Sequence, residues 1–197
     1  MVDGGRNLRK GGDDVTSTLV VIDNNDEIPL AIVSYPFRKL KYVDLIGDVY
    51  WLPNNFEEMR EYQSHGISYF KMKPRELRRD IKELRVLERC DVSRDDPMRV
   101  RLDELREMTD GKVMRFVGSL SKMLMTLVIG TSDVFISKKA IKAPFHDYAA
   151  AKKIIVDLNG KFTDLEGKEP NVGEDINGIL AASSNENYNL FKNFLYS

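Results

Sequence analysis

Cysteine and histidine are scarce in this chain. Its 197 residues include one cysteine, Cys90, and two histidines, His65 and His146. A single cysteine excludes a disulfide within the chain, and proteins without disulfides are typical of a reducing compartment. The two histidines lie far apart in the sequence, without the spacing of a zinc site or of a nucleophilic triad. The sequence therefore indicates neither a zinc centre nor a Ser-His-Asp or Cys-His arrangement.

An excess of charge and long apolar runs are also missing. The chain has 30 basic and 31 acidic residues, and this balance does not indicate a nucleic-acid surface. No apolar run approaches the roughly 20 residues that span a bilayer. Residues 1–12 lack the apolar centre of a secretory signal. We therefore predict a cytoplasmic protein without a membrane partner.

The composition is that of a globular domain. Hydrophobic residues make up 42% of the chain and charged residues 31%, which is too apolar for a disordered protein. A chain of 197 residues can bury one sizeable core. We expect residues 1–197 to form a single domain.

Strand patterns come first in the sequence, and helix and strand patterns alternate later. The segments 17–23 and 28–35 form a predicted hairpin, and 40–52 reads as a third strand. Helices are predicted over 74–85, 96–111, 119–130, 146–158 and 185–195, and strands over 112–118, 132–137, 161–165 and 178–183. The segment 85–92 fits a strand or a continuation of the preceding helix. This order predicts a layered α/β domain in which helices cover sheets.

Two aspartates are candidate metal ligands. Asp147 opens a predicted helix, where an acid can simply complement the helix dipole, an effect of about 0.3–1 kcal/mol. Held rigidly there, the same carboxylate can instead bind a hard cation such as Mg²⁺. Asp3 precedes Gly4 and Gly5. This stretch is either an unstructured terminus or a turn whose carboxylate binds metal and whose backbone N–H groups face a phosphate.

A third candidate is the segment 116–122, a strand followed by a glycine and a helix start. A helix N-terminus attracts anions. After Gly118, Ser119 and Lys122 offer a hydroxyl and an ammonium. An ordinary turn with a serine cap explains the same residues. The basic run within 73–89 is interleaved with acids, which favours a solvated face over a nucleic-acid stripe.

Taken in order, these segments resemble a known family. An Asp-Gly turn precedes a hairpin, then come "GSLSK", "PFHDYAAAKKIIVDLNGKFTDLEGK" and "GILAASSNENYNLFKNFL". The chain resembles the inositol monophosphatase superfamily of Mg²⁺-dependent, lithium-sensitive phosphatases, and is most similar to its 3′(2′),5′-bisphosphate nucleotidase branch. The most specific part is 145–167, where the family has Trp-Asp, a small-residue helix, a glycine and Thr-Asp-x-x-Gly. Here these are His146-Asp147, Ala149 to Ala151, Gly160 and Thr163 to Gly167.

The resemblance implies a fold, a cofactor and a site. The fold would be a sugar-phosphatase-like sandwich of sheets and helices, and the substrate a 3′-phosphoadenosine nucleotide, an inositol phosphate or another small phosphomonoester. Asp3 and Asp147 would hold Mg²⁺. The residues implied at the phosphate or substrate are Gly4, Gly5, Gly118, Ser119 and Lys122.

The sequence also departs from the family pattern. Gly5 replaces a threonine that positions the attacking water, and His146 replaces the tryptophan. The first aspartate of the family's motif would fall just before Met1, and the family's N-terminal helices and remaining acids have no counterpart. The chain thus resembles the downstream two-thirds of the fold. We expect weak metal binding and little turnover by this chain alone.

Two arrangements would cover the apolar sheet face that the absent helices leave bare. One is a homodimer, and the other is a separate upstream chain that complements this one. The alternative to an enzyme is a non-catalytic remnant or assembly module of the same fold. Nucleic-acid binding through residues 73–89 is a third and less favoured reading.

Overall fold

The structure is a computed structural model of the chain. It describes residues 2–3, 16–35, 40–45, 48–53, 70–72, 77–89, 97–109, 112–116 and 118–197. Gly4 and Gly5 lie outside these ranges, as does most of the segment between β5 and β7. Among the described residues, every helix is too short or too polar to cross a membrane.

The first sheet is an antiparallel meander from the N-terminal part of the chain. Its strands follow one another in sequence order and are β1 (Val2–Asp3), β2 (Thr16–Val21), β3 (Leu30–Tyr35), β4 (Leu40–Leu45), β5 (Asp48–Pro53) and β6 (Phe70–Lys71). Along β2, Thr16 and Thr18 are buried whereas Leu19 and Val21 are exposed. The inner face of this strand therefore carries hydroxyl groups into the interior.

The second sheet is mixed and comes from the C-terminal part of the chain. Its order is β10 (Lys161–Thr163), β11 (Ile176–Ala182), β9 (Val134–Ala143), β7 (Val86–Arg89) and β8 (Val113–Phe116). β7 runs parallel to β8 and β9, and the other two pairings are antiparallel. Parallel pairs need a crossover, and helices supply it on both faces of this sheet.

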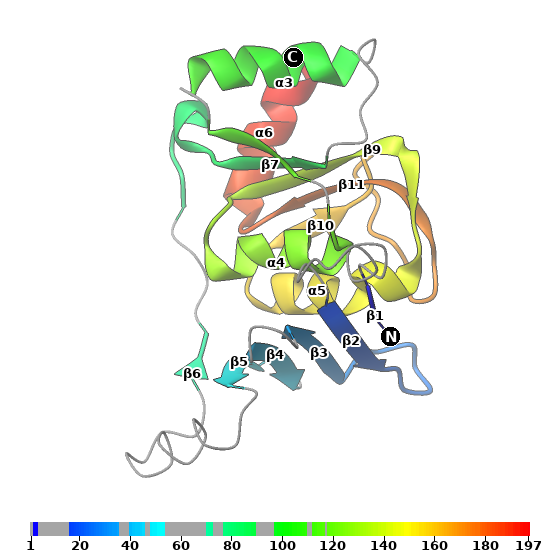
Figure 1. Cartoon of the computed structure of the whole chain (residues 1–197). Coiled ribbons are helices and arrows are strands. Elements are labelled where there is room, and N and C mark those ends of the chain that lie inside the picture. The colour runs from blue at the N-terminus through cyan, green and yellow to red at the C-terminus, as the bar shows by residue number, and fades with distance from the viewer. Residues whose placement is uncertain are drawn as a thin grey trace.

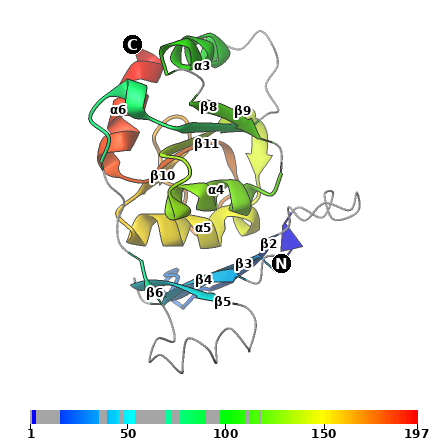
Figure 2. The same ribbon diagram turned by 60° about the vertical axis from the view of Figure 1, so that its left-hand side comes forward.

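Helices and sheets alternate as layers (Figures 1 and 2). Helices α4 (Leu120–Ile129) and α5 (Phe145–Asp157) lie between the two sheets, and α3 (Pro97–Met108) and α6 (Asn185–Tyr196) cover the far face of the second sheet. The first core surrounds α4 and α5 and includes Leu124, Phe135 and Ile154. The second core, beneath α3 and α6, includes Leu102 and Phe191. The predicted layered α/β fold is confirmed.

Local sequence signals account for the helix ends. Ser119 caps α4 by accepting a hydrogen bond from the Lys122 N–H, and Gly130 ends that helix in the left-handed conformation with φ of 79°. Ser184 caps α6 in the same way through the Asn187 N–H. The predicted helices over 96–111, 119–130, 146–158 and 185–195 are all present.

Two predicted elements are wrong. The run 40–52 is two strands, β4 and β5, which pair with each other. The helix predicted over 74–85 is, in its described part, only the single 3₁₀ turn Ile81–Glu83. Leu84 is buried in the second core, and Arg85 bonds to Asp133, so both residues adopt the extended path into β7. The strand alternative for 85–92 is confirmed over Val86–Arg89.

Candidate functional site

The first turn of α4 is bonded to the start of β2. The hydroxyl oxygens of Ser119 and Thr16 lie 2.7 Å apart, and both residues are fully buried. Ser119 Oγ also accepts from the Lys122 N–H at 3.2 Å. Thr16 is in turn the backbone partner of Asp3 in the β1–β2 ladder. The backbone of Asp3 therefore lies one strand away from the residue that contacts the start of α4.

The first turn of α5 lies against the first turn of α4. Ser121 Oγ donates to the carbonyl oxygen of Asp147 at 2.6 Å. On the other side, Thr18 Oγ1 donates to the carbonyl oxygen of His146 at 3.3 Å. The positive ends of two helix dipoles therefore lie side by side at the start of β2, which favours anions there.

The Asp147 side chain is partly accessible at this junction. Its relative exposure is 27%, and its Oδ1 lies 3.3 Å from Nε2 of His146, which is half exposed. By contrast, α4 has no acid in its first turn. The start of α5 thus carries a carboxylate, whereas the neighbouring start of α4 carries none. A cation would suit the start of α5, and a phosphate would suit the start of α4 beside it.

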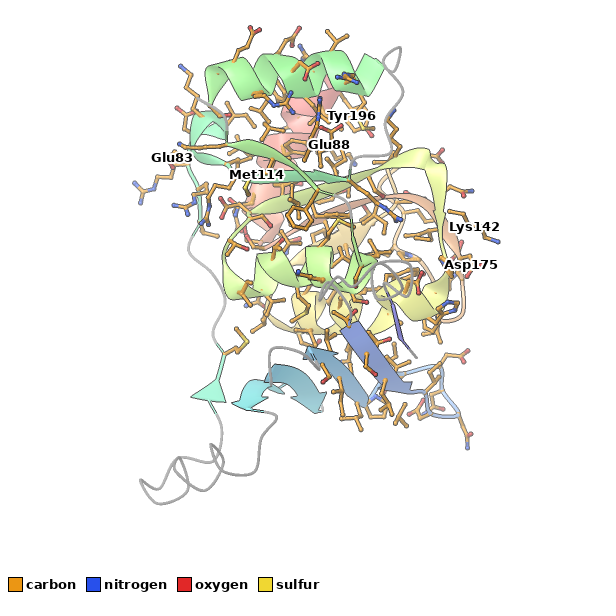
Figure 3. All side chains as sticks on the ribbon, viewed as in Figure 1. Glu83, Glu88, Met114, Lys142, Asp175 and Tyr196 are labelled. Atoms are coloured by element: carbon orange, nitrogen blue, oxygen red, sulfur yellow. The ribbon has the colours of Figure 1, made fainter. Side chains whose placement is uncertain are left out.

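The loop before β11 fixes the start of α5. The Phe145 N–H donates to Asp175 Oδ1 at 2.8 Å, and Lys142 Nζ lies 3.1 Å from Asp175 Oδ2, a pair labelled in Figure 3. The backbone hydrogen bond from Phe145, followed by the Lys142 ammonium, holds the pKa of Asp175 below its usual value. The N-cap residue of α5, Pro144, makes no side-chain hydrogen bond to the helix. The Asp175 carboxylate, which lies outside the helix, caps α5 in its place.

Aromatic packing holds α5 against the second sheet. Tyr148 is fully buried and stacks on Phe162 with centroids 5.2 Å apart, and Phe145 meets Tyr148 edge-on at 5.6 Å. The Tyr148 hydroxyl donates to the Glu174 carbonyl oxygen. Burial, with a smaller contribution from Glu174, raises the pKa of Tyr148, so the hydroxyl remains a donor. The helix that carries Asp147 is therefore rigidly mounted.

The other predicted site residues either lie close to the start of α4 or are not among the residues that the structure describes. Gly118 immediately precedes the capping Ser119, and Lys122 Nζ lies 6.0 Å from the centroid of the Phe116 ring. Gly4, Gly5 and the side chain of Asp3 are outside what the structure describes. In the described part of the chain, no group of three or more His, Cys, Asp or Glu side chains could hold a metal ion. Of the two candidate metal ligands, Asp147 is the one whose side chain the structure describes.

Sequence reasoning missed three residues that connect the site. Thr16 and Thr18 supply hydroxyls from β2, and Ser121 supplies one from α4. The alternation of threonines with other residues along 16–18 is a signal that could have placed both on one face. Ser121 carries no such signal, because a serine in a helix most often bonds locally or to solvent.

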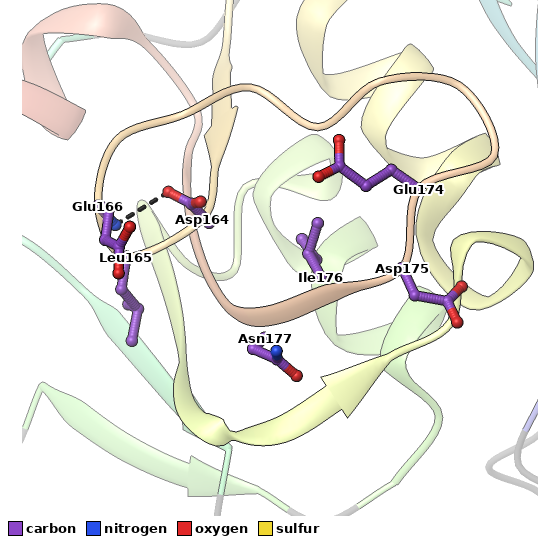
Figure 4. A pocket seen from close by; sticks show the side chains of 7 residues that line it. All are labelled: Asp164, Leu165, Glu166, Glu174, Asp175, Ile176 and Asn177. Carbon is purple, nitrogen blue, oxygen red and sulfur yellow. Dashed lines mark hydrogen bonds between the residues drawn. The ribbon is translucent and has the colours of Figure 1, made fainter.

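Two cavities flank the start of α5. One, of about 260 Å³, is lined by Thr18, Leu19, Val20, Phe145 and His146. The other, of about 200 Å³, is shown in Figure 4 and is lined mainly by acids, from the connection between β10 and β11 and from the start of β11, namely Asp164, Leu165, Glu166, Glu174, Asp175, Ile176 and Asn177. Four carboxylates in one small cavity oppose the binding of a phosphate. The first cavity is therefore the better candidate for part of a phosphorylated substrate.

The fold is shared with solved phosphatase structures. An inositol monophosphatase from Zymomonas mobilis is similar over 100% of this chain and 68% of its own, with a TM-score of 0.71 and 14% identity. SaIMPase-II, solved with 2′AMP bound, matches 99% of this chain and 66% of its own, with a TM-score of 0.73 and 11% identity. A hypothetical protein of Pyrococcus horikoshii with similarities to inositol-1 monophosphatase covers 100% and 67%, with a TM-score of 0.69 and 19% identity. The chain thus spans about two thirds of the length of these proteins. No curated protein matches it in sequence.

Sequence and fold agree on one family. The model of the inositol monophosphatase family matches residues 2–194. The chain belongs to the inositol monophosphatase family. Membership supports a phosphatase of this superfamily and dependence on a metal ion, which in this family is generally Mg²⁺.

Proposed function

We propose that the chain is a Mg²⁺-dependent phosphomonoesterase of the inositol monophosphatase or 3′(2′),5′-bisphosphate nucleotidase type. Its substrate would be a small phosphorylated metabolite or nucleotide. The observation that carries the proposal is the bond from Ser121 to the carbonyl of Asp147, because it sets an accessible carboxylate beside a second helix start. Residues 1–197 would act as one phosphatase-like domain, since the α4–α5 layer packs on both sheets. We propose the cytoplasm as its location.

Asp147 and Asp3 are the proposed metal ligands. The rigid mounting of α5 and the pairing of Asp3 with Thr16 support this assignment. When bound, Mg²⁺ supplies an activated water and offsets charge on the phosphate oxygens. Backbone N–H groups of Gly4 and Gly5 and of the turn at Gly118 would face those oxygens.

The start of α4 is the proposed phosphate-binding end of the site. Lys122 would offer its ammonium to the substrate. Ser119 would act through its backbone and by holding the first turn, because its hydroxyl is buried and already bonded to Thr16 and to the Lys122 N–H. Gly5 has no hydroxyl with which to orient the attacking water. We therefore propose weak turnover by this chain alone.

The second candidate is a non-catalytic assembly module of the same fold. The observation in its favour is that the described residues contain no group of three or more metal-ligating side chains. Such a module would bind neither Mg²⁺ nor phosphate analogues, and would self-associate or pair with another chain.

Phosphate release measured with and without Mg²⁺ tests the proposal. The substrates are 4-nitrophenyl phosphate, adenosine 3′,5′-bisphosphate and myo-inositol 1-phosphate, and EDTA provides the metal-free arm. We expect slow release that requires Mg²⁺, together with heat on titration of Mg²⁺ into the chain. Absence of both release and Mg²⁺ binding, with a folded protein by circular dichroism, would assign the chain to the assembly class, and ultracentrifugation would then give its oligomeric state.

A further inference from the structure

Asp147 lies between two residues of α5 that are bonded to a segment outside the helix. Two positions before it, the Phe145 N–H donates to Asp175 Oδ1 at 2.8 Å. Directly after it, the Tyr148 hydroxyl donates to the carbonyl oxygen of Glu174. The two acceptors belong to consecutive residues just before β11, both labelled in Figure 4. One short segment therefore holds the first turn of α5, which carries the proposed metal ligand.

The connection that supplies these acceptors has its own hydrogen-bonded structure. Glu174 Oε2 accepts from the N–H and the Nδ2 of Asn171, at 2.9 and 3.1 Å. Lys168 Nζ donates to Glu174 Oε1 at 3.0 Å. Further back, Asp164 Oδ1 accepts the N–H groups of Glu166 and Lys168, at 2.9 and 2.8 Å. The start of α5 is therefore bonded to a folded connection with a defined position.

The bond to Phe145 is a capping bond that the N-cap residue of α5 does not provide. The first N–H groups of a helix have no partner within the helix, and a side chain or water must supply one. Pro144, at the N-cap, makes no side-chain hydrogen bond. Without the Asp175 oxygen, the Phe145 N–H would lose this partner. The first turn, which includes Asp147, would then open more readily than the rest of the helix.

The oxygen of Asp175, and not its charge, makes this bond. The charge is paired with Lys142, but 38% of the Asp175 side chain and 68% of the Lys142 side chain are exposed. An exposed ion pair contributes little, because water and salt screen it. The bond to the Phe145 N–H is short and directional. An asparagine oxygen caps a helix about as well as an aspartate oxygen, so it can replace this acceptor.

We propose that Asp175 is a positioning residue for the metal site. Its side-chain oxygen holds the first turn of α5, and thereby keeps the Asp147 carboxylate in place for the cation. The inference rests on the proposed function, since it takes Asp147 as a ligand of Mg²⁺. Removal of a group that orients a metal ligand typically lowers metal affinity 10–100-fold.

Calorimetric titration of Mg²⁺ into variants of the full chain tests the proposal. Asp175→Ala removes the acceptor and should weaken Mg²⁺ binding about tenfold. Asp175→Asn removes the charge but keeps an oxygen, and should bind Mg²⁺ within about twofold of the wild type. Ser184→Ala is the matched control. It removes the bond from the Asn187 N–H that caps α6, and should leave Mg²⁺ affinity unchanged.

Hydrogen exchange of the backbone amides separates a local effect from a general loss of stability. Asp175→Ala should speed exchange at Phe145 and Asp147, whereas Ser184→Ala should speed it at Asn187 instead. Circular dichroism sets a temperature at which every variant is folded. Because the Asp175 side chain is partly exposed, its truncation leaves no buried cavity.

The outcomes distinguish this inference from the proposed function. If Asp147→Asn weakens Mg²⁺ binding but Asp175→Ala binds as the wild type does, the positioning role alone is overturned. Equal weakening by Asp175→Ala and Asp175→Asn would show that the charge matters, and equal weakening by Ser184→Ala would show a general loss of stability. Each of these results would also overturn it. Absence of Mg²⁺ binding by the wild-type chain would instead remove the proposed function, and the positioning role with it.

Discussion

The hydroxyl oxygens of Thr16 and Ser119 lie 2.7 Å apart in the interior, although 103 positions separate the two residues in the chain. This contact joins the first sheet to the helix layer. It also sets the start of α4 beside the strand that pairs with Asp3. The candidate site therefore depends on a buried polar contact between two segments that are distant in the sequence.

Removal of one partner from this contact should destabilise the fold. In Thr16→Val the hydroxyl is replaced by a methyl of similar size, and the bond to Ser119 is lost. We expect a loss of about 1–3 kcal/mol in the free energy of unfolding, measured in urea. Ser119→Ala also removes the cap of α4 and should cost about 1–2 kcal/mol. If the double variant is destabilised by the full sum of the single variants, the two hydroxyls do not interact, and the contact is refuted.

Asp147→Asn tests the metal ligand. Loss of a group that merely supports a ligand typically lowers metal affinity 10–100-fold, so loss of a direct ligand should weaken Mg²⁺ binding by at least about 100-fold. Calorimetric titration of Mg²⁺ measures this. Asp157→Asn removes the same charge at the other end of α5, about 15 Å away along the axis, and should leave Mg²⁺ affinity nearly unchanged. Equal affinity of the two variants would exclude Asp147 as a ligand.

The ion pair of Arg85 and Asp133 should make stability depend on pH. Burial alone would raise the pKa of Asp133, but the Arg85 backbone N–H, Nε and Nη2 donate to its carboxylate at 3.0, 2.9 and 2.7 Å and lower the pKa. A depressed pKa adds stability above the unfolded value of about 3.9, and this stability is lost as the pH falls through the folded value.

Asp133→Asn should therefore lower the free energy of unfolding at neutral pH, by about 1–3 kcal/mol. It should also flatten the dependence of that free energy on pH below about 4. Urea unfolding at a series of pH values measures both effects. Asp26→Asn, in an exposed turn, is the control. A wild-type pH profile in Asp133→Asn would show that another group causes the acid sensitivity.

Alanine substitutions at two glycines with positive φ distinguish the cost of backbone strain from the cost of a steric clash. Gly178 in β11 has φ of 77°, and a Cβ there would lie 2.7 Å from Leu165 Cδ1 and 2.9 Å from the Lys138 carbonyl carbon. Gly173 has φ of 80° and nothing within 4 Å of that position. Alanine at Gly173 should cost only the left-handed strain, about 1–2 kcal/mol, and alanine at Gly178 clearly more. Thermal unfolding of both variants measures the difference, and equal melting temperatures would contradict it.

Some structure was predictable because its cause is local. Ser119, Gly130 and Ser184 act on residues within four positions of themselves, and the helices they bound were predicted. The run 40–52 was harder to predict because its apolar sequence pattern continues from β4 into β5 without a clear break. The false helix over 74–85 had a helical pattern, but burial of Leu84 and the bonds of Arg85 to Asp133 outweighed this local preference.

The sequence by itself determined the helix ends, the strand-rich first half and the identity of the candidate site residues, because caps, periodicity and motifs depend on near neighbours. Only the tertiary structure decided which of these residues meet. The pairing of Thr16 with Ser119, the bond from Ser121 to Asp147 and the cavity beside His146 arise from how the two sheets stack on the α4–α5 layer. Such contacts follow from the packing of whole layers, to which many distant residues contribute and which no short pattern encodes.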